Sequence, residues 1–584
     1  MSIKAFFARS ELRTTLWAFR REFVVVGLFS MVANLLMLSP TIYMLQVYDR
    51  VLVSHSELTL LAVSLITLFL FAVIAVAEWS RSRLLVRAGV RLDAALGTRV
   101  FSASFEANLS QSGAPAQRAF ADLLEIRQFL TGTGIFAFFD APWTPIYITV
   151  LFFLHPFLGW VAILFALVQA AFVWFGHRHT VAPAKAASEA QAAVNTFLQG
   201  KLRNAEVVEA MGMLGGLRQR WQQRHAAYRS CQAHAQGQAH RMTAVSKWMR
   251  YSQQSLSLGA GALLVIDGQL SPGAMIAANV LMSRALAPID LMVGTWRSFL
   301  GARSAFERLE KLLDAHPERD PALTRVPPTG ALELRDVVAS APGRATPILK
   351  GVSLRAEPGS VTVVLGPSGS GKSTLARVLV GIWPDRQGEV LLDGHPIEGW
   401  NRIDLGSYLG YLPQDIELFD GTIAENIARF AEVDSGKVIA AAQSAGLHEM
   451  ILRFPKGYDT PIGEAGGMLS GGQRQRIGLA RAIYGEPALV VLDEPNANLD
   501  DVGEAALNQT VRELKAKGKT VFLITHRPGA INLADRLLLL ADGQVQLQGP
   551  RDAVLAHLRA MQAQAAAAAP RQAVSGGDAL PSAA

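Results

Sequence analysis

Six apolar segments precede Leu300, and each is long enough to cross a lipid bilayer as a helix, which takes about 20 residues. The chain has 584 residues and is 50% hydrophobic, so it is too long for one domain and too apolar for a purely soluble protein. We therefore expect an α-helical membrane domain of six spans followed by a second domain. The segments are Phe23–Tyr48, Leu58–Ala77, Phe136–Leu154, Phe157–Phe175, Trp248–Ile266 and Met275–Leu300.

The connections between these segments alternate in length and charge. Glu78–Gly134 and Gly176–Ser246 are long and rich in arginine, whereas the short connections contain Arg50 as their only Lys or Arg. Because Lys and Arg concentrate in cytosolic loops, the long connections are predicted to be cytosolic, and both read as helices that continue beyond the membrane. The short connections are Asp49–Glu57, His155–Pro156 and Asp267–Gly273.

The fifth segment is the most polar, with Gln253 and Gln254 among several serines. These groups are expected to face other helices or a cavity. Charge inside a span is costly and usually functional. Asp140 precedes Ala-Pro and is favoured as a helix N-cap over a group lining a transport path. Asp290 either pairs with Arg284 or lines that path. Trp143, Tyr147 and Trp160 are expected to anchor at the membrane interface.

The string GPSGSGKST in the second half fits the pattern G-x-x-x-x-G-K-[ST]. It lies between the β-rich run Val361–Leu365 and the helical pattern Leu375–Val380, which is the context that the motif requires. Backbone N–H groups can close around phosphate oxygens, Lys372 can reach the β- and γ-phosphates, and Ser373 can ligate Mg²⁺. The predicted nucleotide contacts are Gly366, Pro367, Ser368, Gly369, Ser370, Gly371, Lys372, Ser373 and Thr374.

The string VVLDEP predicts a buried strand that ends in two carboxylates at the edge of a parallel sheet. Asp493 is expected to hold Mg²⁺ through water, and Glu494 to polarise the attacking water. His526 follows another apolar strand, as a γ-phosphate sensor would. Gln414, in GYLPQD, is expected to contact Mg²⁺ and water. We therefore predict Glu494, His526 and Gln414 as catalytic residues.

These motifs, with LSGGQ at Leu469–Gln473 and the loop Asn498–Asp500, resemble the α/β P-loop ATPase of ABC transporters, which uses ATP and Mg²⁺. In that family the helix start formed by LSGGQ contacts the γ-phosphate of the ATP that is bound to the opposite ATPase domain. One phosphate-binding loop and one LSGGQ per chain therefore imply a head-to-tail homodimer with two identical sites. The resemblance adds Ser470, Gly471, Gly472, Gln473 and Asp500 to the predicted nucleotide contacts.

Six spans ahead of an ATPase on one chain is the export arrangement of this superfamily. The helical cytosolic extensions are expected to carry a transverse helix to each ATPase and transmit its closure; the alternative is a solvated hairpin without a coupling role. A different class of function is an ATP-gated channel or regulator that does not pump. Glu494 and His526 argue against that class because both serve hydrolysis.

Long stretches of the membrane half closely resemble the ABC component of type I secretion systems, in the branch that exports metalloproteases and RTX-type proteins. The resemblance implies export of an unfolded polypeptide cargo that carries an uncleaved C-terminal signal. It also implies a periplasmic membrane fusion protein, an outer-membrane channel protein and a location in the bacterial inner membrane. The alternative is an exporter of lipid, drug or small peptide. The stretches are Asn34–Leu61, Phe138–Tyr147, Asn204–Leu214 and Ala285–Leu309.

The predicted domain boundaries follow from these segments. A basic amphipathic segment, 1–21, is expected to lie at the membrane interface and does not resemble a cleaved signal. The membrane domain covers 22–312, a linker 313–329, the ATPase 330–561 and a disordered tail 562–584. Cys231 is the only cysteine, so no disulfide framework is expected. The lipid bilayer is an expected partner and nucleic acid is not.

Two features depart from the family pattern. Only about twenty residues precede the first span, so a leader-cleaving peptidase domain is not expected. No Phe, Tyr or Trp lies between Phe306 and Trp383, so the aromatic that usually stacks on adenine has no counterpart. The stretch Val337–Lys350 offers only Pro342, aliphatic groups and Arg344 for that task.

Overall fold

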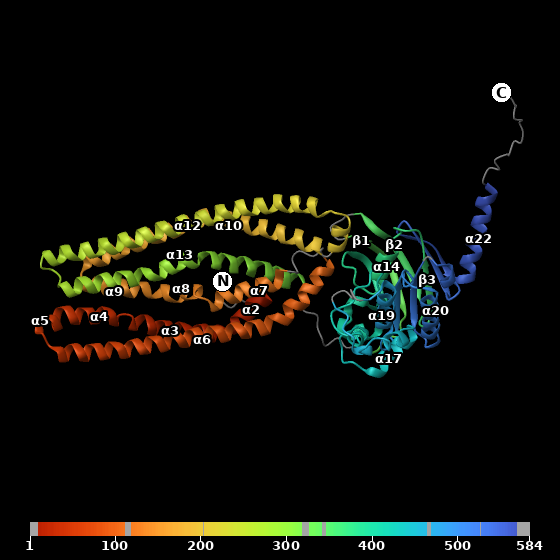
Figure 1. Ribbon diagram of the computed structural model, residues 1–584, viewed down its shortest axis with the longest axis horizontal. Helices are drawn as coiled ribbons and strands as arrows, with labels where there is room; N and C mark the ends of the chain where they lie inside the picture. Colours follow the sequence, from red (N-terminus) through yellow and green to blue (C-terminus); the bar gives the residue numbers. More distant parts are fainter. Residues whose placement is uncertain are drawn as a thin grey trace, which may run out of the picture. The chain divides into compact units, whose positions relative to one another are not determined.

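Two units of different secondary structure make up the chain in the computed structural model (Figure 1). One unit, residues 1–108 and 113–318, is helical, and the other, residues 109–112 and 319–584, is built around β-sheets. The structure describes residues 10–110, 118–202, 204–317, 326–341, 346–463, 469–525 and 527–568. A helical membrane domain followed by an α/β ATPase domain is the predicted fold class, and it is confirmed.

The helices of the first unit are longer than a bilayer is thick. At a rise of 1.5 Å per residue, the 54 residues of α6 span about 80 Å, against about 30 Å for the hydrocarbon core. The predicted extensions beyond the membrane are therefore helical. The elements are α2 (Glu11–Ala18), α3 (Arg20–Leu36), α4 (Ser39–Gln46), the π-helix η1 (Val47–Val51), α5 (Leu52–Ser54), α6 (Glu57–Ser110), α7 (Ala119–Thr131), α8 (Gly134–Asp140), the 3₁₀-helix η3 (Ala141–Trp143), α9 (Thr144–Leu154), α10 (Pro156–Leu202), α11 (Ala205–Ala210), α12 (Leu214–Ile266) and α13 (Pro272–Ala315).

Five helical stretches of the described residues are long and apolar enough to cross a membrane, and they contain five of the six predicted spans. Large apolar side chains face outward on them; Leu58 and Phe69 are 78% and 68% exposed, as a lipid-facing surface requires. The stretches are Arg20–Ser54, Glu57–Leu109, Gly134–Leu154, Pro156–Leu202 and Pro272–Ala315.

The sixth predicted span, Trp248–Ile266, is the end of α12 and is not among these five. Its glutamines and serines lower its hydropathy. Gln253 and Ser257 are nevertheless buried, and the Gln253 amide donates to the carbonyl oxygen of Phe165 on α10 at 3.3 Å. Gln253 therefore contacts a neighbouring helix, as expected, whereas Gln254 is exposed, and α10 and α12 run side by side (Figure 1). That this segment crosses the bilayer stays a prediction.

Asp140 forms an ion pair rather than a helix cap, so the favoured interpretation is wrong. No side-chain capping bond is present at η3. The Asp140 carboxylate instead accepts from Arg81 on α6 at 3.0 Å and from Asn34 on α3 at 2.8 Å. The Tyr147 hydroxyl donates to the Asn34 carbonyl oxygen at 2.7 Å and is 3% exposed. Tyr147 is therefore buried in this polar network and is not an interfacial anchor.

Asp290 has a different partner from the one expected. Its carboxylate accepts a hydrogen bond from the Gln169 side chain on α10. None of the ion pairs found among the described residues joins it to Arg284, so the structure supports a polar contact between α13 and α10 instead.

The start of α13 is held by a carboxylate from the first span. Asp49 in η1 accepts from the backbone N–H of Gly273 at 2.9 Å and from the Ser271 hydroxyl. A Cβ at Gly273 would lie 2.4 Å from the Asp49 Oδ1, so only glycine leaves room for this contact. The carboxylate satisfies N–H groups that a helix start leaves unpaired.

The described part of the N-terminal segment packs on the other helices, and its placement at the membrane interface stays a prediction. Leu12 on α2 is 1% exposed in a core with residues of α6, α7 and α13. Arg13 pairs with Glu310 on α13 at 2.6 Å, and Glu11 pairs with Arg99 on α6 at 3.1 Å. Apolar burial and two ion pairs therefore fix α2 to the ends of α6 and α13.

The second unit contains two sheets. A four-stranded antiparallel sheet has the order β2-β1-β4-β5, and a six-stranded sheet has the order β10-β9-β3-β8-β7-β6, parallel except for β10. The central strands β3, β7 and β8 are almost fully buried. The strands are β1 (Leu332–Ser340), β2 (Pro347–Ala356), β3 (Val361–Leu365), β4 (Arg386–Leu392), β5 (His395–Pro396), β6 (Leu409–Leu412), β7 (Leu489–Asp493), β8 (Thr520–Ile524), β9 (Arg536–Ala541) and β10 (Gln544–Pro550).

Short helices pack around these sheets (Figure 1). The last helix extends to Ala568, past Gln562, where the disordered tail was predicted to begin; residues 569–584 lie outside the described residues. The helices are α14 (Lys372–Leu379), the 3₁₀-helix η4 (Ile397–Gly399), α15 (Arg402–Tyr408), α16 (Ile423–Ile427), α17 (Ser435–Ser444), α18 (His448–Ile451), the 3₁₀-helix η5 (Gly457–Asp459), α19 (Gly471–Ile483), α20 (Asp501–Ala516), α21 (Pro528–Ile531) and α22 (Arg551–Ala568).

Candidate functional site

The phosphate-binding motif forms the predicted loop between β3 and α14. Gly369 and Gly371 have φ values of +80° and +97°, which side chains rarely adopt, so glycine lets the loop curl back on itself. A Cβ at Gly366 would lie 2.1 Å from the Leu540 carbonyl oxygen on β9. The loop thus lies close to the sheet edge, and among the described residues no side chain caps the start of α14, which leaves this helix start available to an anion.

Lys372 lies across this loop. Its ammonium donates to the carbonyl oxygens of Gly366 at 2.9 Å and of Pro367 at 2.8 Å. Burial lowers the pKa of Lys372, while the charges of Glu494 and Asp493 oppose that shift. The ammonium is therefore fixed beside the loop, where it can meet phosphate oxygens.

Three predicted site residues form one hydrogen-bonded chain. The Ser373 hydroxyl donates to the Gln414 side-chain oxygen at 3.4 Å, and the Gln414 amide donates to the Glu494 carboxylate at 3.2 Å. These residues come from α14, from the loop after β6 and from the end of β7. The sheet topology thus brings the predicted Mg²⁺ and water contacts together.

Asp493 is the last residue of β7 and is 2% exposed. Burial raises the pKa of this carboxyl group, partly offset by a hydrogen bond from Ser373. Its Oδ1 atom has no hydrogen-bond partner among the described residues. A buried carboxylate oxygen without a partner is costly, and a cation would satisfy it.

Glu494 and its neighbour are held by a residue that the sequence analysis missed. Glu494 has a φ of +49°, a strained conformation for a side chain of this size, and its N–H donates to the Ile524 carbonyl oxygen at 2.9 Å. The buried Gln475 on α19 donates to the carbonyl oxygen of Pro495 at 2.9 Å. Gln475 lies two residues after LSGGQ and belongs to no motif. Its burial on α19 and its bond to Pro495 identify it.

The LSGGQ residues form the start of α19 with a reciprocal cap. The Ser470 side chain accepts from the Gln473 N–H at 3.3 Å, and the Gln473 side chain accepts from the Ser470 N–H at 2.9 Å. A Cβ at Gly472 would lie 2.9 Å from the Asn498 carbonyl oxygen, so the loop before α20 packs closely on this turn.

Asp500 is the N-cap of α20 and not a contact of its own chain's phosphate loop. It accepts from the Gly503 N–H at 2.8 Å and pairs with Arg476 on α19. In the described residues neither Ser470 nor Asp500 hydrogen bonds to the phosphate loop of the same chain. The two halves of the predicted site are therefore separate within one chain.

Two other predictions concern residues that lie mostly outside the described part of the chain. His526 lies outside the described residues, although β8, which precedes it, pairs with both β3 and β7. Pro342 and Arg344, predicted near the adenine, also lie outside them. Ala341 follows β1, and the Trp383 indole donates to the carbonyl oxygen of the adjacent Ser340 at 2.9 Å. An aromatic distant in sequence thus contacts this region.

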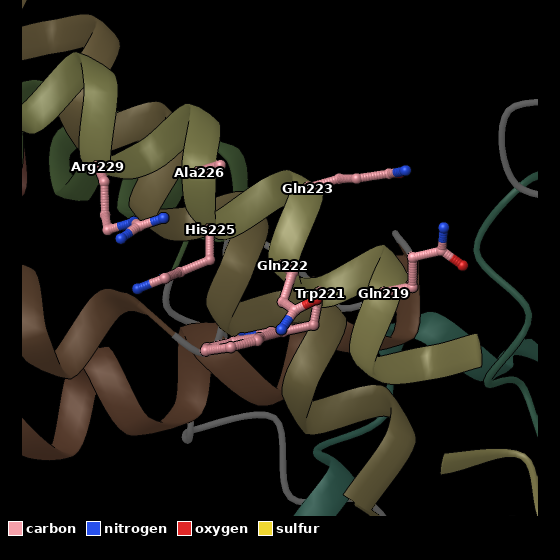
Figure 2. Close-up of a pocket in the computed structure, with 7 residues that line it drawn as sticks. All are labelled: Gln219, Trp221, Gln222, Gln223, His225, Ala226 and Arg229. Carbon is pink, nitrogen blue, oxygen red and sulfur yellow. The ribbon is translucent and has the colours of Figure 1, made fainter. Parts of the chain in front are cut away.

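An open hollow of about 650 Å³ lies along α12, apart from these residues (Figure 2). The rings of Trp221 and His225 stack there with centroids 4.6 Å apart. The hollow contains no residue of the predicted nucleotide site. It is lined by Gln219, Trp221, Gln222, Gln223, His225, Ala226 and Arg229.

Comparisons with known proteins agree with this geometry. The ABC transporter family model matches residues 349–497, and the ABC transporter transmembrane region model matches residues 23–288. The type I secretion system ATP-binding protein PrsD of Rhizobium meliloti is 43% identical over 92% of this chain and 92% of that protein. The cyclolysin secretion/processing ATP-binding protein CyaB of Bordetella pertussis is 30% identical over 91% of this chain and 75% of that protein.

A solved structure supports the fold. A bacterial Atm1-family ABC exporter with ATP bound superimposes with a TM-score of 0.81 and 23% identity, covering 95% of this chain and 99% of that one. Both family models match the chain, and relatives matching over nine-tenths of it are secretion ATP-binding proteins. The chain therefore belongs to the ABC transporter family, as an ATP-hydrolysing membrane component of a type I secretion system that works with the other parts of that system.

Proposed function

We propose that two copies of this chain, assembled head to tail in the bacterial inner membrane, export an unfolded polypeptide that carries an uncleaved C-terminal signal. A periplasmic membrane fusion protein and an outer-membrane channel protein complete the route. The cargo class rests on the names of PrsD and CyaB, which both concern secretion and match over most of the chain. The homodimer rests on one observation: each chain carries a phosphate loop and an LSGGQ helix start that do not meet.

The donor set at the sheet edge fits Mg²⁺, which takes oxygen ligands and keeps several waters. Ser373 offers a hydroxyl, Gln414 an amide oxygen, and Asp493 a buried carboxylate oxygen that lacks a partner among the described residues. When bound, the ion would neutralise charge on the β- and γ-phosphates. The orphaned Asp493 oxygen is the observation that favours this ion.

Glu494 is the residue that would orient the attacking water. It lies one residue beyond Asp493, and Gln414 holds its carboxylate. Lys372, whose ammonium donates to carbonyl oxygens of the loop, would stabilise the negative charge that develops on the phosphates during transfer. The strained backbone at Glu494 fixes this carboxylate at the strand end instead of leaving it on a mobile turn.

Coupling to transport would run through α11. This six-residue helix joins the extensions of α10 and α12, and its surroundings expose apolar side chains: Val207, Met211 and Leu214 are 51%, 70% and 59% exposed. An exposed apolar helix suits docking to another surface better than it suits solvent. We propose that it is the transverse helix that receives the motion of an ATPase domain.

Replacing Glu494 by Gln should leave ATP binding intact and lower turnover by roughly 10²- to 10⁴-fold, because the amide cannot act as a base. ATP hydrolysis by the purified protein measures this. Glu486→Gln is the matched control, since Glu486 is an exposed carboxylate paired with Lys517. Near-normal hydrolysis by Glu494→Gln would remove Glu494 from the catalytic role.

Mixed dimers should distinguish trans from cis sites. Ser470→Arg chains paired with Lys372→Ala chains should retain one intact composite site if the LSGGQ of one chain completes the loop of the other. ATP occlusion in doubly tagged, purified dimers measures this. Occlusion no higher than in either parent homodimer would contradict the trans arrangement.

Secretion should depend on the C-terminus of the cargo. A polypeptide that stimulates ATP hydrolysis by the purified chain should lose both stimulation and export when its C-terminal segment is deleted. An internal deletion of equal length is the control and should preserve both. Normal export of the cargo without its C-terminus would overturn the proposed recognition mode.

Without the aromatic residue that usually stacks on adenine, the protein should discriminate less between ATP and GTP. Stacking on an aromatic is worth roughly 1–3 kcal/mol per base, so GTP should compete with ATP better here than in relatives with the aromatic, and Ala341→Tyr should tighten ATP binding. Titrations of both nucleotides test this, with Ala341→Leu as a control for bulk without a ring. A strong native preference for ATP would mean that another group, such as Arg344 or Trp383, already reads the base.

A further inference from the structure

Arg429 follows α16 and binds four backbone carbonyl oxygens. Its Nε and Nη2 atoms donate to the carbonyl oxygens of Arg481 and Ala482, each at 2.9 Å. Its Nη1 atom donates to those of Gly406 at 2.6 Å and Leu409 at 3.0 Å. One guanidinium therefore joins two separate parts of the ATPase unit.

These four carbonyls lie at the C-terminal ends of two helices. Arg481 and Ala482 are in the last turn of α19, the helix that begins with LSGGQ. Gly406 and Leu409 are at the end of α15 and the start of β6, the strand that leads to Gln414. The last carbonyls of a helix lack intrahelical partners and carry partial negative charge, which a cation stabilises. Arg429 thus fixes α19, called the signature helix below, against the strand that leads to Gln414.

The local structure is built to hold this guanidinium. Arg429 and Phe430 have φ values of +59° and +57°, and two consecutive left-handed residues without glycine persist only where the surroundings impose them. Arg429 pairs with no carboxylate among the described residues. Burial and the nearby Arg481 lower the pKa of Arg429 to about 10. Among the described residues, the helix-end carbonyl oxygens and not a carboxylate therefore compensate this buried cation.

The opposite end of α15 repeats the arrangement. Arg402 donates to the Val380 carbonyl oxygen at 2.8 Å and to that of Gly381, and both residues directly follow α14. α14 is the helix that begins at the phosphate loop. Charge-assisted hydrogen bonds therefore run from the end of the phosphate-loop helix, through α15, to the end of the signature helix.

We propose that Arg429 is a positioning residue for the partner's nucleotide site, and this inference rests on the proposed head-to-tail dimer. By holding α19 against α15, Arg429 orients Ser470 and Gly472 relative to the same chain's phosphate loop. In such a dimer those two parts belong to different composite sites. Loss of Arg429 should then impair the site that its own signature helix completes more than the site that its own phosphate loop forms.

Two mixed dimers test this prediction in a Glu494→Gln background, in which bound ATP is retained. In the first, an Arg429→Gln chain is paired with a Lys372→Ala chain, so that the intact phosphate loop meets a normal signature helix. In the second, an Arg429→Gln, Lys372→Ala chain is paired with a chain that has both residues intact, so that the intact loop meets the altered helix. The first should retain ATP, and the second about tenfold less, which corresponds to about 1.4 kcal/mol.

Controls separate this role from simple stability. Arg453→Gln, which removes an exposed guanidinium of the same unit, should leave both dimers equal. Arg429→Lys should give an intermediate difference, because lysine keeps the charge but not the planar fork. The same two dimers are also made with Ser470→Arg in place of Arg429→Gln. If the Ser470→Arg dimers differ in ATP retention but the two Arg429→Gln dimers do not, at any level, the inference is overturned. If the Ser470→Arg dimers are also equal, the composite dimer itself fails and the inference with it.

Discussion

Parallel pairing of β3, β8, β7 and β6 is the constraint on which the catalytic site depends. Val364 and Asp493 both pair with Ile524, and Leu412 pairs with Leu492, so the four strands end nearly level. The phosphate loop, the carboxylates and Gln414 follow directly after these ends. Because ligands bind outside the carboxyl ends of parallel strands, residues far apart in sequence meet at one edge. A shift of the strand register would separate Gln414 from Glu494.

Charged groups in the two units are buried in different ways. In the helical unit, Arg81 meets Asp140, so a cation and a carboxylate compensate each other. In the ATPase unit, Arg429 donates to four carbonyl oxygens and pairs with no carboxylate among the described residues. A buried ion pair offsets its own desolvation in part, whereas the carbonyl arrangement depends on helix ends that are brought together first.

Much of this architecture follows from sequence patterns. The phosphate loop, the carboxylate strand and five spans were predictable because each depends on local pattern and short spacing. Partners distant in sequence were not: Asp140 meets Asn34 across 106 positions, and a local Asp-Ala-Pro pattern favoured a cap instead. Gln475 and Arg429 were missed for the same reason, since a helix end that receives a guanidinium has no signature in the chain itself. The sixth span stays a prediction because it is not among the five stretches that are long and apolar enough to cross a membrane.

The bond between Asp49 and the start of α13 limits how the helical unit can open. Gly273 has no side chain and so leaves space for that carboxylate. The hydrogen bond from its N–H to Asp49 joins η1 to the first turn of α13. A movement that draws these two ends apart must break a charge-assisted bond at a helix start. Within one chain, the first and last spans are thus joined at the end where η1 meets α13.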